Sequence, residues 1–429
     1  MVFFAIGASF STYFCMYAFR KPFSAGTYEG LTLLGTQIDL KTAFVISQIA
    51  GYTLSKYLGI KVCSEVTRGR RLKMLLGLVV IAEVALLLFA VLPPQLKILA
   101  LFANGIPLGM VWGLVVWHLE GRRSSELLLA GLSCSFILAS GVVKDVGRWL
   151  IEAYGVPEFW MPFATGLVFL VPFVVSAVLL DQLPDPSAAD EDERTQRQPM
   201  DGTLRVSFLK RFFVPLAMLF LAYIFLTAFR DFRDNYGIEI FSELGYAAKP
   251  GIFSRSEPWV ALGVLVPLAL LSCIRDNFLG LLAAFALMIA GAVSLGVSTL
   301  LLDRGAISGL TWMILVGIGS YLAYVPYGTI LFDRMIASTK VMGTAVFAIY
   351  VADALGYSGS VAVQLYKDLA AGEATRLAFF RSFTYALSAG AAALILASAV
   401  LILRSSRRDA TRTTAPSPTA ATPASSTER

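Results

Sequence analysis

Long apolar segments dominate the chain, and short polar segments separate them. The hydrocarbon core of a bilayer is about 30 Å thick, so a helix that crosses it needs roughly 20 mostly apolar residues. The strands of a membrane β-barrel would instead be short and would alternate between apolar and polar positions. The pattern therefore predicts twelve transmembrane helices, at residues 2–27, 43–60, 73–93, 97–118, 127–150, 160–180, 212–235, 257–274, 278–301, 308–331, 341–366 and 379–404.

A polar segment at residues 181–211 divides these predicted helices into two sets of six. It contains an acidic run that begins at Asp190, and it has no apolar periodicity, which is typical of a linker. We therefore expect an all-α integral membrane protein made of two pseudo-symmetric six-helix bundles, at residues 1–180 and 212–404. The segment 405–429 is basic and then rich in Thr, Ala, Ser and Pro, so we expect a disordered tail.

Basic residues gather in alternate loops, which predicts the orientation of the helices. In multi-pass membrane proteins the loops rich in Lys and Arg face the cytoplasm. We therefore expect a multi-pass protein of the cytoplasmic membrane, with both termini and the central linker in the cytoplasm. The basic loops carry, among others, Arg68, Arg122, Arg205, Arg275, Arg334 and Arg404.

Composition supports a membrane protein and argues against an enzyme. Hydrophobic residues make up 57% of the chain and charged residues 15%, whereas soluble domains have about 45–50% and about 25%. The net charge of +6 fits the basic loops, so we expect no nucleic-acid partner. The one histidine is His118, and there is no cluster of metal ligands, no Walker-type loop and no GxSxG motif. We expect neither catalysis nor a metal or other cofactor.

Two arginines occupy equivalent points of the two halves. Ala18-Phe19-Arg20 recurs as Ala228-Phe229-Arg230, each late in the first apolar segment of its half. Parallel repeats of this kind place a substrate site between the halves, near the bilayer midplane. The planar donor fork of Arg suits phosphate or carboxylate, so Arg20 and Arg230 are candidates to bind an anion. The alternative is that both side chains snorkel to the membrane surface.

Two carboxylates are candidates to carry a proton. Asp353 lies in the middle of an apolar segment, and Glu257 begins the eighth predicted helix. Ionised groups inside a membrane usually face a cavity or a partner. A structural hydrogen bond remains the alternative for Asp353, and a charge at the membrane surface for Glu257.

Lys144 and Tyr324 are further candidates for substrate binding. Lys144 and Arg148 are four residues apart in the fifth predicted helix, so they share a face and offer basic contacts to an anion. An ion pair between Asp145 and Arg148 is the alternative. Tyr324 lies in a row of tyrosines at three-residue spacing, which either lines a cavity or packs as an aromatic cluster.

The loop after the second predicted helix resembles that of the major facilitator superfamily. From Gly59 to Arg71 it is similar to Gly-x-x-x-Asp-Arg-x-Gly-Arg-Arg, with Glu65 in place of Asp. In that superfamily the loop acts in conformational change, so the resemblance implies a gating role without substrate contact. The residues concerned are Glu65, Arg68, Arg70 and Arg71.

Other segments resemble one branch of that superfamily, the organophosphate:phosphate antiporters for glycerol 3-phosphate and hexose phosphates. Tyr17-Ala-Phe-Arg20-Lys21-Pro-Phe23 is similar to the first-helix signature, whose Arg binds phosphate, and Arg230 matches the second such Arg. The segments Tyr52–Tyr57, Tyr324–Pro326 and Gly356–Gly359 are also similar. The branch has a fifth-helix His where this chain has Ser140.

These observations predict a monomeric secondary active transporter that works by alternating access. The resemblance implies antiport of a small organic anion such as a phosphate ester. One alternative is a proton-coupled symporter of another small solute, which would use Asp353 or Glu257. The other is a membrane sensor or scaffold that keeps the fold and binds a ligand without transporting it.

Overall fold

The chain folds into a bundle of long helices, which confirms the all-α prediction. A computed structural model describes residues 2–36, 38–65, 68–119, 122, 125–184, 207, 209–246, 251–339, 345–370 and 374–414. The first half contains α1 (Val2–Met16), the 3₁₀ turns η1 (Tyr17–Phe19) and η2 (Pro22–Ala25), α2 (Leu40–Glu65), α3 (Arg68–Val91), α4 (Lys97–Trp117), α5 (Ser125–Tyr154) and α6 (Met161–Asp181).

The second half repeats this arrangement with two additional short helices. It contains α9 (Phe213–Asn235), α10 (Gly237–Phe241), the turn η3 (Ser242–Tyr246), α11 (Ile252–Ser272), α12 (Asn277–Asp303), α13 (Gly309–Thr329), α14 (Leu331–Thr339), α15 (Ala345–Leu369) and α16 (Arg376–Thr414). Among the described residues, nine helical segments are long and apolar enough to cross a membrane. The long helices α2, α11 and α15 are not among the nine, and each carries charged residues within its length.

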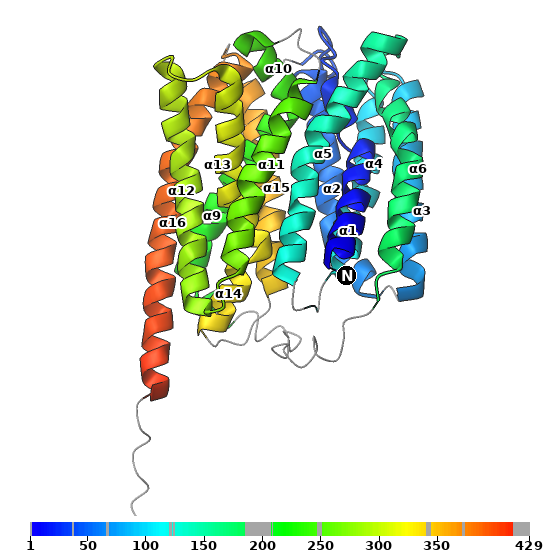
Figure 1. The fold of residues 1–429 in the computed structure, drawn as a ribbon. Coiled ribbons are helices and arrows are strands. Elements are labelled where there is room, and N and C mark those ends of the chain that lie inside the picture. The colour runs from blue at the N-terminus through cyan, green and yellow to red at the C-terminus, as the bar shows by residue number, and fades with distance from the viewer. Residues whose placement is uncertain are drawn as a thin grey trace, which may run out of the picture.

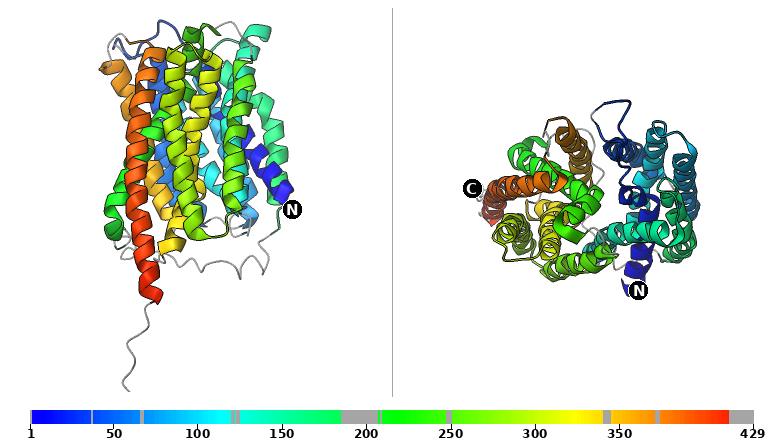
Figure 2. Two further views of the ribbon diagram at one scale, coloured as in Figure 1. Left: turned by 60° about the vertical axis from the view of Figure 1, so that its left-hand side comes forward. Right: turned by 90° about the horizontal axis from the view of Figure 1, so that it is seen from above.

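Each half has an apolar core of its own. One cluster includes Phe19, Phe44 and Phe89 from the first half, and another includes Phe229 and Trp312 from the second. The two groups of helices stand side by side with their axes roughly parallel (Figures 1 and 2). Between them α5 packs against α11, and α2 packs against α15. A third, smaller apolar cluster spans this boundary.

The outer faces of the bundle carry exposed apolar side chains. Ile81 of α3, Val171 of α6 and Val297 of α12 are each more than half exposed. In water such faces would be costly, at roughly 25 cal/mol per Å² of apolar surface. They suit the hydrocarbon of a bilayer.

The first helix is shorter than the predicted 2–27. α1 ends at Met16, and the backbone then turns, with the carbonyl of Tyr17 accepting from the amides of both Arg20 and Lys21. Pro22 begins η2 and has no amide hydrogen to continue an α-helix. The change of direction places Arg20 and Lys21 at the boundary with the second half.

The last helix is longer than the predicted 379–404. α16 continues to Thr414, through residues expected to belong to a disordered tail. The sequence from Arg404 to Thr414 contains no proline or glycine, so nothing in it stops a helix. The beginning of α1 and the end of α16 lie at the same end of the bundle, and α10 lies at the opposite end (Figure 1).

Candidate functional site

A short polar network fixes the backbone beside Arg20. Gly105 of α4 allows close contact with α2, because a Cβ there would lie 2.3 Å from the carbonyl oxygen of Gln48. This contact brings Asn104 to Gln48, whose side-chain amide donates to the Asn104 side chain and to the Arg20 carbonyl, both at 2.8 Å. Asn104 in turn donates to the Phe19 carbonyl at 3.0 Å. The turn that carries Arg20 is therefore held from both neighbouring helices.

Arg20 itself is buried without a carboxylate partner among the described residues. Only 5% of the residue is exposed. Its guanidinium lies 3.9 Å from the ring centroid of Tyr52 on α2 and 5.7 Å from that of Tyr17. The Nε atom is buried and has no hydrogen-bond partner among the described residues. Arg20 is therefore enclosed by protein.

Arg230 approaches the same region from α9. Its guanidinium lies 4.3 Å from the ring centroid of Tyr324 on α13. It donates from Nη2 to Asp231 Oδ1 at 2.9 Å and from Nε to the same oxygen at 3.3 Å. Both Arg20 and Arg230 act electrostatically on Tyr17 and Tyr357. The two halves thus bring their arginines to one group of tyrosines.

Tyrosine rings from both halves line the boundary here. Tyr52 of α2 and Tyr357 of α15 pack edge to face, with ring centroids 5.1 Å apart. Tyr223 of α9 stacks on Tyr324 at 4.9 Å, and their hydroxyl oxygens are 2.9 Å apart. Tyrosine combines an apolar ring with a hydroxyl that both donates and accepts.

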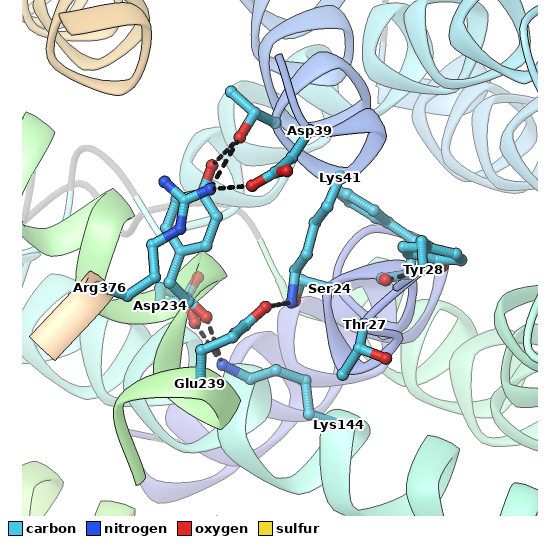
Figure 3. Close-up of polar contacts among 12 residues, drawn as sticks. Ser24, Thr27, Tyr28, Asp39, Lys41, Lys144, Asp234, Glu239 and Arg376 are labelled. Atoms are coloured by element: carbon cyan, nitrogen blue, oxygen red, sulfur yellow. Dashed lines mark hydrogen bonds and ion pairs between the residues drawn. The ribbon is translucent and has the colours of Figure 1, made fainter. Parts of the chain in front are cut away.

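Asp234 joins the two halves beside the arginines. Lys21 Nζ lies 2.5 Å from its Oδ2 atom, and Lys144 Nζ lies 2.8 Å from its Oδ1 atom. Ser140 also donates to this carboxylate, and Lys21 donates to Asn235 at 2.9 Å. Figure 3 shows Lys144 of α5 reaching toward Asp234. In this conformation Lys144 contacts protein rather than standing free for an anion.

Asp353 pairs with a basic residue of the other half. Its Oδ2 lies 3.6 Å from Lys56 Nζ on α2, and the Tyr223 hydroxyl donates to Oδ1 at 2.5 Å. Tyr223 also contacts Tyr324, so hydroxyl contacts lead from Asp353 as far as Tyr324, whose ring lies beside Arg230. Sequence reasoning singled out Asp353 but not Lys56.

The other charged candidates lie away from these hydroxyl contacts. Glu257 is buried and binds Arg233 at 2.9 Å, within the second half, so it is not a surface charge. The ion pair considered between Asp145 and Arg148 is not formed. Asp145 instead accepts from the amide and hydroxyl of Ser254, at 2.6 and 2.7 Å, and Arg148 pairs with Glu152 at 3.2 Å.

Further ion pairs join the halves at the end opposite the termini. Lys41 of α2 pairs with Glu239 of α10. Arg376, which begins α16, contacts Asp39 of the first half at 2.7 Å (Figure 3) and Asp368 of its own half at 2.7 Å. The pairs of Lys41 with Glu239 and of Arg376 with Asp39 connect segments far apart in the sequence, so no local pattern pointed to them.

The loop predicted to act in gating lies only partly within the described residues. The side chains of Glu65 and Arg68 lie outside them. Arg70 is exposed, and the guanidinium of Arg71 lies 4.6 Å from the ring centroid of Trp117 on α4. The gating role of these four residues stays a prediction.

Solved transporter structures share this fold. A D-xylose-proton symporter matches with a TM-score of 0.59 and 15% identity, over 94% of this chain and 96% of that one. The nucleoside transporter NupG (D323A mutant) matches with a TM-score of 0.56 and 13% identity, over 94% of this chain and 100% of that one. A third match is a structure described as giving insights into substrate recognition in proton dependent oligopeptide transporters. Its TM-score is 0.61 and its identity 14%, over 95% of this chain and 100% of that one.

The chain therefore is an all-helical membrane protein with the fold of the major facilitator transporters, and the proteins that it resembles are transporters rather than enzymes. No curated protein matches its sequence. A family model described as a family of unknown function (DUF5690) matches residues 22–405, so the chain belongs to that family.

Proposed function

We propose that this member of the DUF5690 family is a secondary active transporter of a small organic anion, such as a phosphate ester, in the cytoplasmic membrane. One observation carries the proposal. Arg20 and Arg230 come from opposite halves to one group of tyrosines, and Arg20 is buried without a carboxylate partner among the described residues. Charge-assisted bonds from two guanidiniums suit an anion held between the halves.

The charge around this site supports an anionic substrate. Among the described residues around the two arginines, the buried or half-buried ionic groups include more cations than carboxylates. Buried charge costs several kcal/mol per ion unless it is paired. A bound anion would offset the positive charge of this group. Its members are Arg20, Lys21, Lys56, Lys144 and Arg230, with Asp231, Asp234 and Asp353.

The construction of the molecule supports transport by alternating access. The halves have separate apolar cores, and breakable ion pairs such as Lys41 with Glu239 join them at the end opposite the termini. We propose that these pairs open when the halves rock about the site. We propose that the loop from Glu65 to Arg71 restrains the other end, in the gating role that the sequence resemblance implies.

Proton-coupled symport is the second candidate, and Asp353 favours it. Its ion pair with Lys56 is long at 3.6 Å, and hydroxyl contacts through Tyr223 lead from it as far as Tyr324. A carboxylate that leaves such a pair in a buried site tends to bind a proton. Antiport, which the sequence resemblance implies, requires no such proton.

A ligand screen followed by reconstitution tests the proposal. Purified protein is heated with a panel of phosphorylated and carboxylated metabolites, since a ligand at 100 times its Kd stabilises the folded state by about 2.7 kcal/mol. Each ligand that stabilises the protein is then offered to proteoliposomes. We expect uptake or exchange of a phosphorylated compound, loss of it in Arg20→Gln, and retention in Arg381→Gln, whose arginine pairs with Asp303 far from the site. Binding without flux would instead indicate a sensor.

A further inference from the structure

We propose that Asp231 determines substrate specificity by accepting a hydrogen bond from a neutral hydroxyl group carried by the anion. The inference rests on the proposed function, because it concerns the same site. It narrows the substrate class to hydroxylated anions, as opposed to anions with a purely apolar body.

Asp231 is a buried carboxylate of which only one oxygen has a partner. Only 3% of the residue is exposed. Its Oδ1 atom accepts both donors from Arg230, at 2.9 and 3.3 Å, whereas Oδ2 is buried and accepts no hydrogen bond from any described residue. A buried charged oxygen left without a hydrogen bond is costly, and such atoms are rare in folded proteins. The unpartnered Oδ2 atom of Asp231 is therefore a position where a hydrogen-bond donor of the substrate can bind.

A second atom without a partner lies in the same polar region. The Nε donor of Arg20 is buried and has no hydrogen-bond partner among the described residues. Lys21, the next residue in the chain, lies 2.5 Å from Asp234, which is three residues after Asp231 on α9. The segments that carry Arg20 and Asp231 therefore face each other. A ligand that satisfies the Arg20 donor and the Asp231 acceptor combines an anionic oxygen with a donor group.

The charge of the site decides between a hydroxyl and an ammonium donor. Arg230 contacts Asp231 directly, and Lys21 binds Asp234, three residues further along α9. An additional ammonium would meet these cations in a region of low effective dielectric, where like charges repel strongly. A neutral hydroxyl donates one hydrogen bond without adding charge.

Arg230 keeps donors for the anion while it holds Asp231. A guanidinium carries five N–H donors, and Asp231 receives bonds from Nε and Nη2. The Nη1 donors and the second Nη2 donor can contact an anionic group. Binding of the hydroxylated anion therefore requires no rupture of the Arg230–Asp231 pair.

A pair of probes that differ only in hydroxyl groups tests the inference. The dissociation constants of glycerol 3-phosphate and propyl phosphate are measured on the full-length wild-type protein. A hydrogen bond to a charged group changes affinity by about 10–150-fold. We expect wild-type protein to prefer glycerol 3-phosphate by a factor in this range. Equal affinity for both probes would overturn the role of Asp231 and leave the anion site intact.

A variant pair assigns the preference to Asp231. In Asp231→Asn the acceptor loses its charge, so the preference should fall to within a few-fold. Asp303→Asn removes the charge of the carboxylate that pairs with Arg381, at a more exposed position, and should keep the preference. A preference unchanged in Asp231→Asn would overturn the inference, and so would its loss in Asp303→Asn alone.

Two further experimental outcomes are interpreted separately from the preference itself. If wild-type protein binds neither probe, the proposed phosphate-ester function fails and the inference fails with it. If Asp231→Asn does not elute as a single species, Asp231→Ser takes its place and should likewise reduce the preference to within a few-fold, whereas a preference unchanged in Asp231→Ser would overturn the inference.

Discussion

Lys21, in the turn after η1, forms an ion pair with Asp234 of α9, and the two charged atoms lie 2.5 Å apart. Lys144 of α5 contacts the other oxygen of the same carboxylate at 2.8 Å. One aspartate of the second half thus holds two lysines of the first half, directly beside the arginines of the proposed site.

Asp234→Ala should strongly destabilise this conformation. It leaves two lysines buried without a counter-charge, and loss of one partner of a buried pair typically costs about 3–5 kcal/mol. The free energy of unfolding in detergent is the measurement. Asp303→Ala is the matched control, because its partner Arg381 is 41% exposed at the side chain. The control should lose about 1 kcal/mol or less. Equal losses in the two variants would show that Asp234 contributes no more than a surface charge.

In proton-coupled transport, Asp353 should be the residue that binds the coupled proton. Asp353→Asn cannot exchange a proton but keeps the size of the side chain, so uptake should lose its dependence on an imposed pH gradient while ligand affinity remains. Proteoliposome uptake with and without the gradient measures the effect. Persistence of full pH-driven accumulation in the variant would make Asp353 a structural residue.

Both termini should lie in the cytoplasm. The prediction comes from the basic loops, and the structure places the beginning of α1 and the end of α16 at one end of the bundle (Figure 1). Reporter tags fused at each terminus are the measurement, with a third tag in the linker at residues 181–211. A signal from outside the cell at any of the three would contradict the assigned orientation.

Nine of the twelve predicted spans correspond to described helices that are long and apolar enough to cross a membrane, because lipid imposes length and apolarity on such helices. The break after Met16 was not predictable, since the apolar pattern continues through Phe19 while the backbone turns ahead of Pro22. Similarly, nothing in the basic sequence after Arg404 marks where α16 ends. The periodicity of apolar residues predicts which positions are buried. It does not predict where the backbone turns at the end of a helix.

The site was predictable only in part, for a related reason. Arg20, Arg230 and Asp353 stand out as charges within apolar segments, and the structure brings them into one polar region. Their partners do not stand out. Lys56 and Asp353 are almost 300 residues apart, and only the packing of α2 against α15 reveals the pair.

The arginine pair is the centre of the proposed mechanism, and lysine substitution tests it. Lys keeps the positive charge but lacks the planar fork of donors. Loss of one hydrogen bond to a charged group weakens binding by about 10–150-fold. Folding should survive, because the exchange keeps the charge.

The most direct measurement is the dissociation constant of inorganic phosphate for Arg20→Lys and Arg230→Lys, each eluting as a single species. Arg381→Lys, at the exposed pair with Asp303, serves as the control. We predict weaker binding by about 10–150-fold in both site variants and no change in the control. Wild-type affinity in both site variants would contradict the account, because a simple positive charge would then suffice at each position.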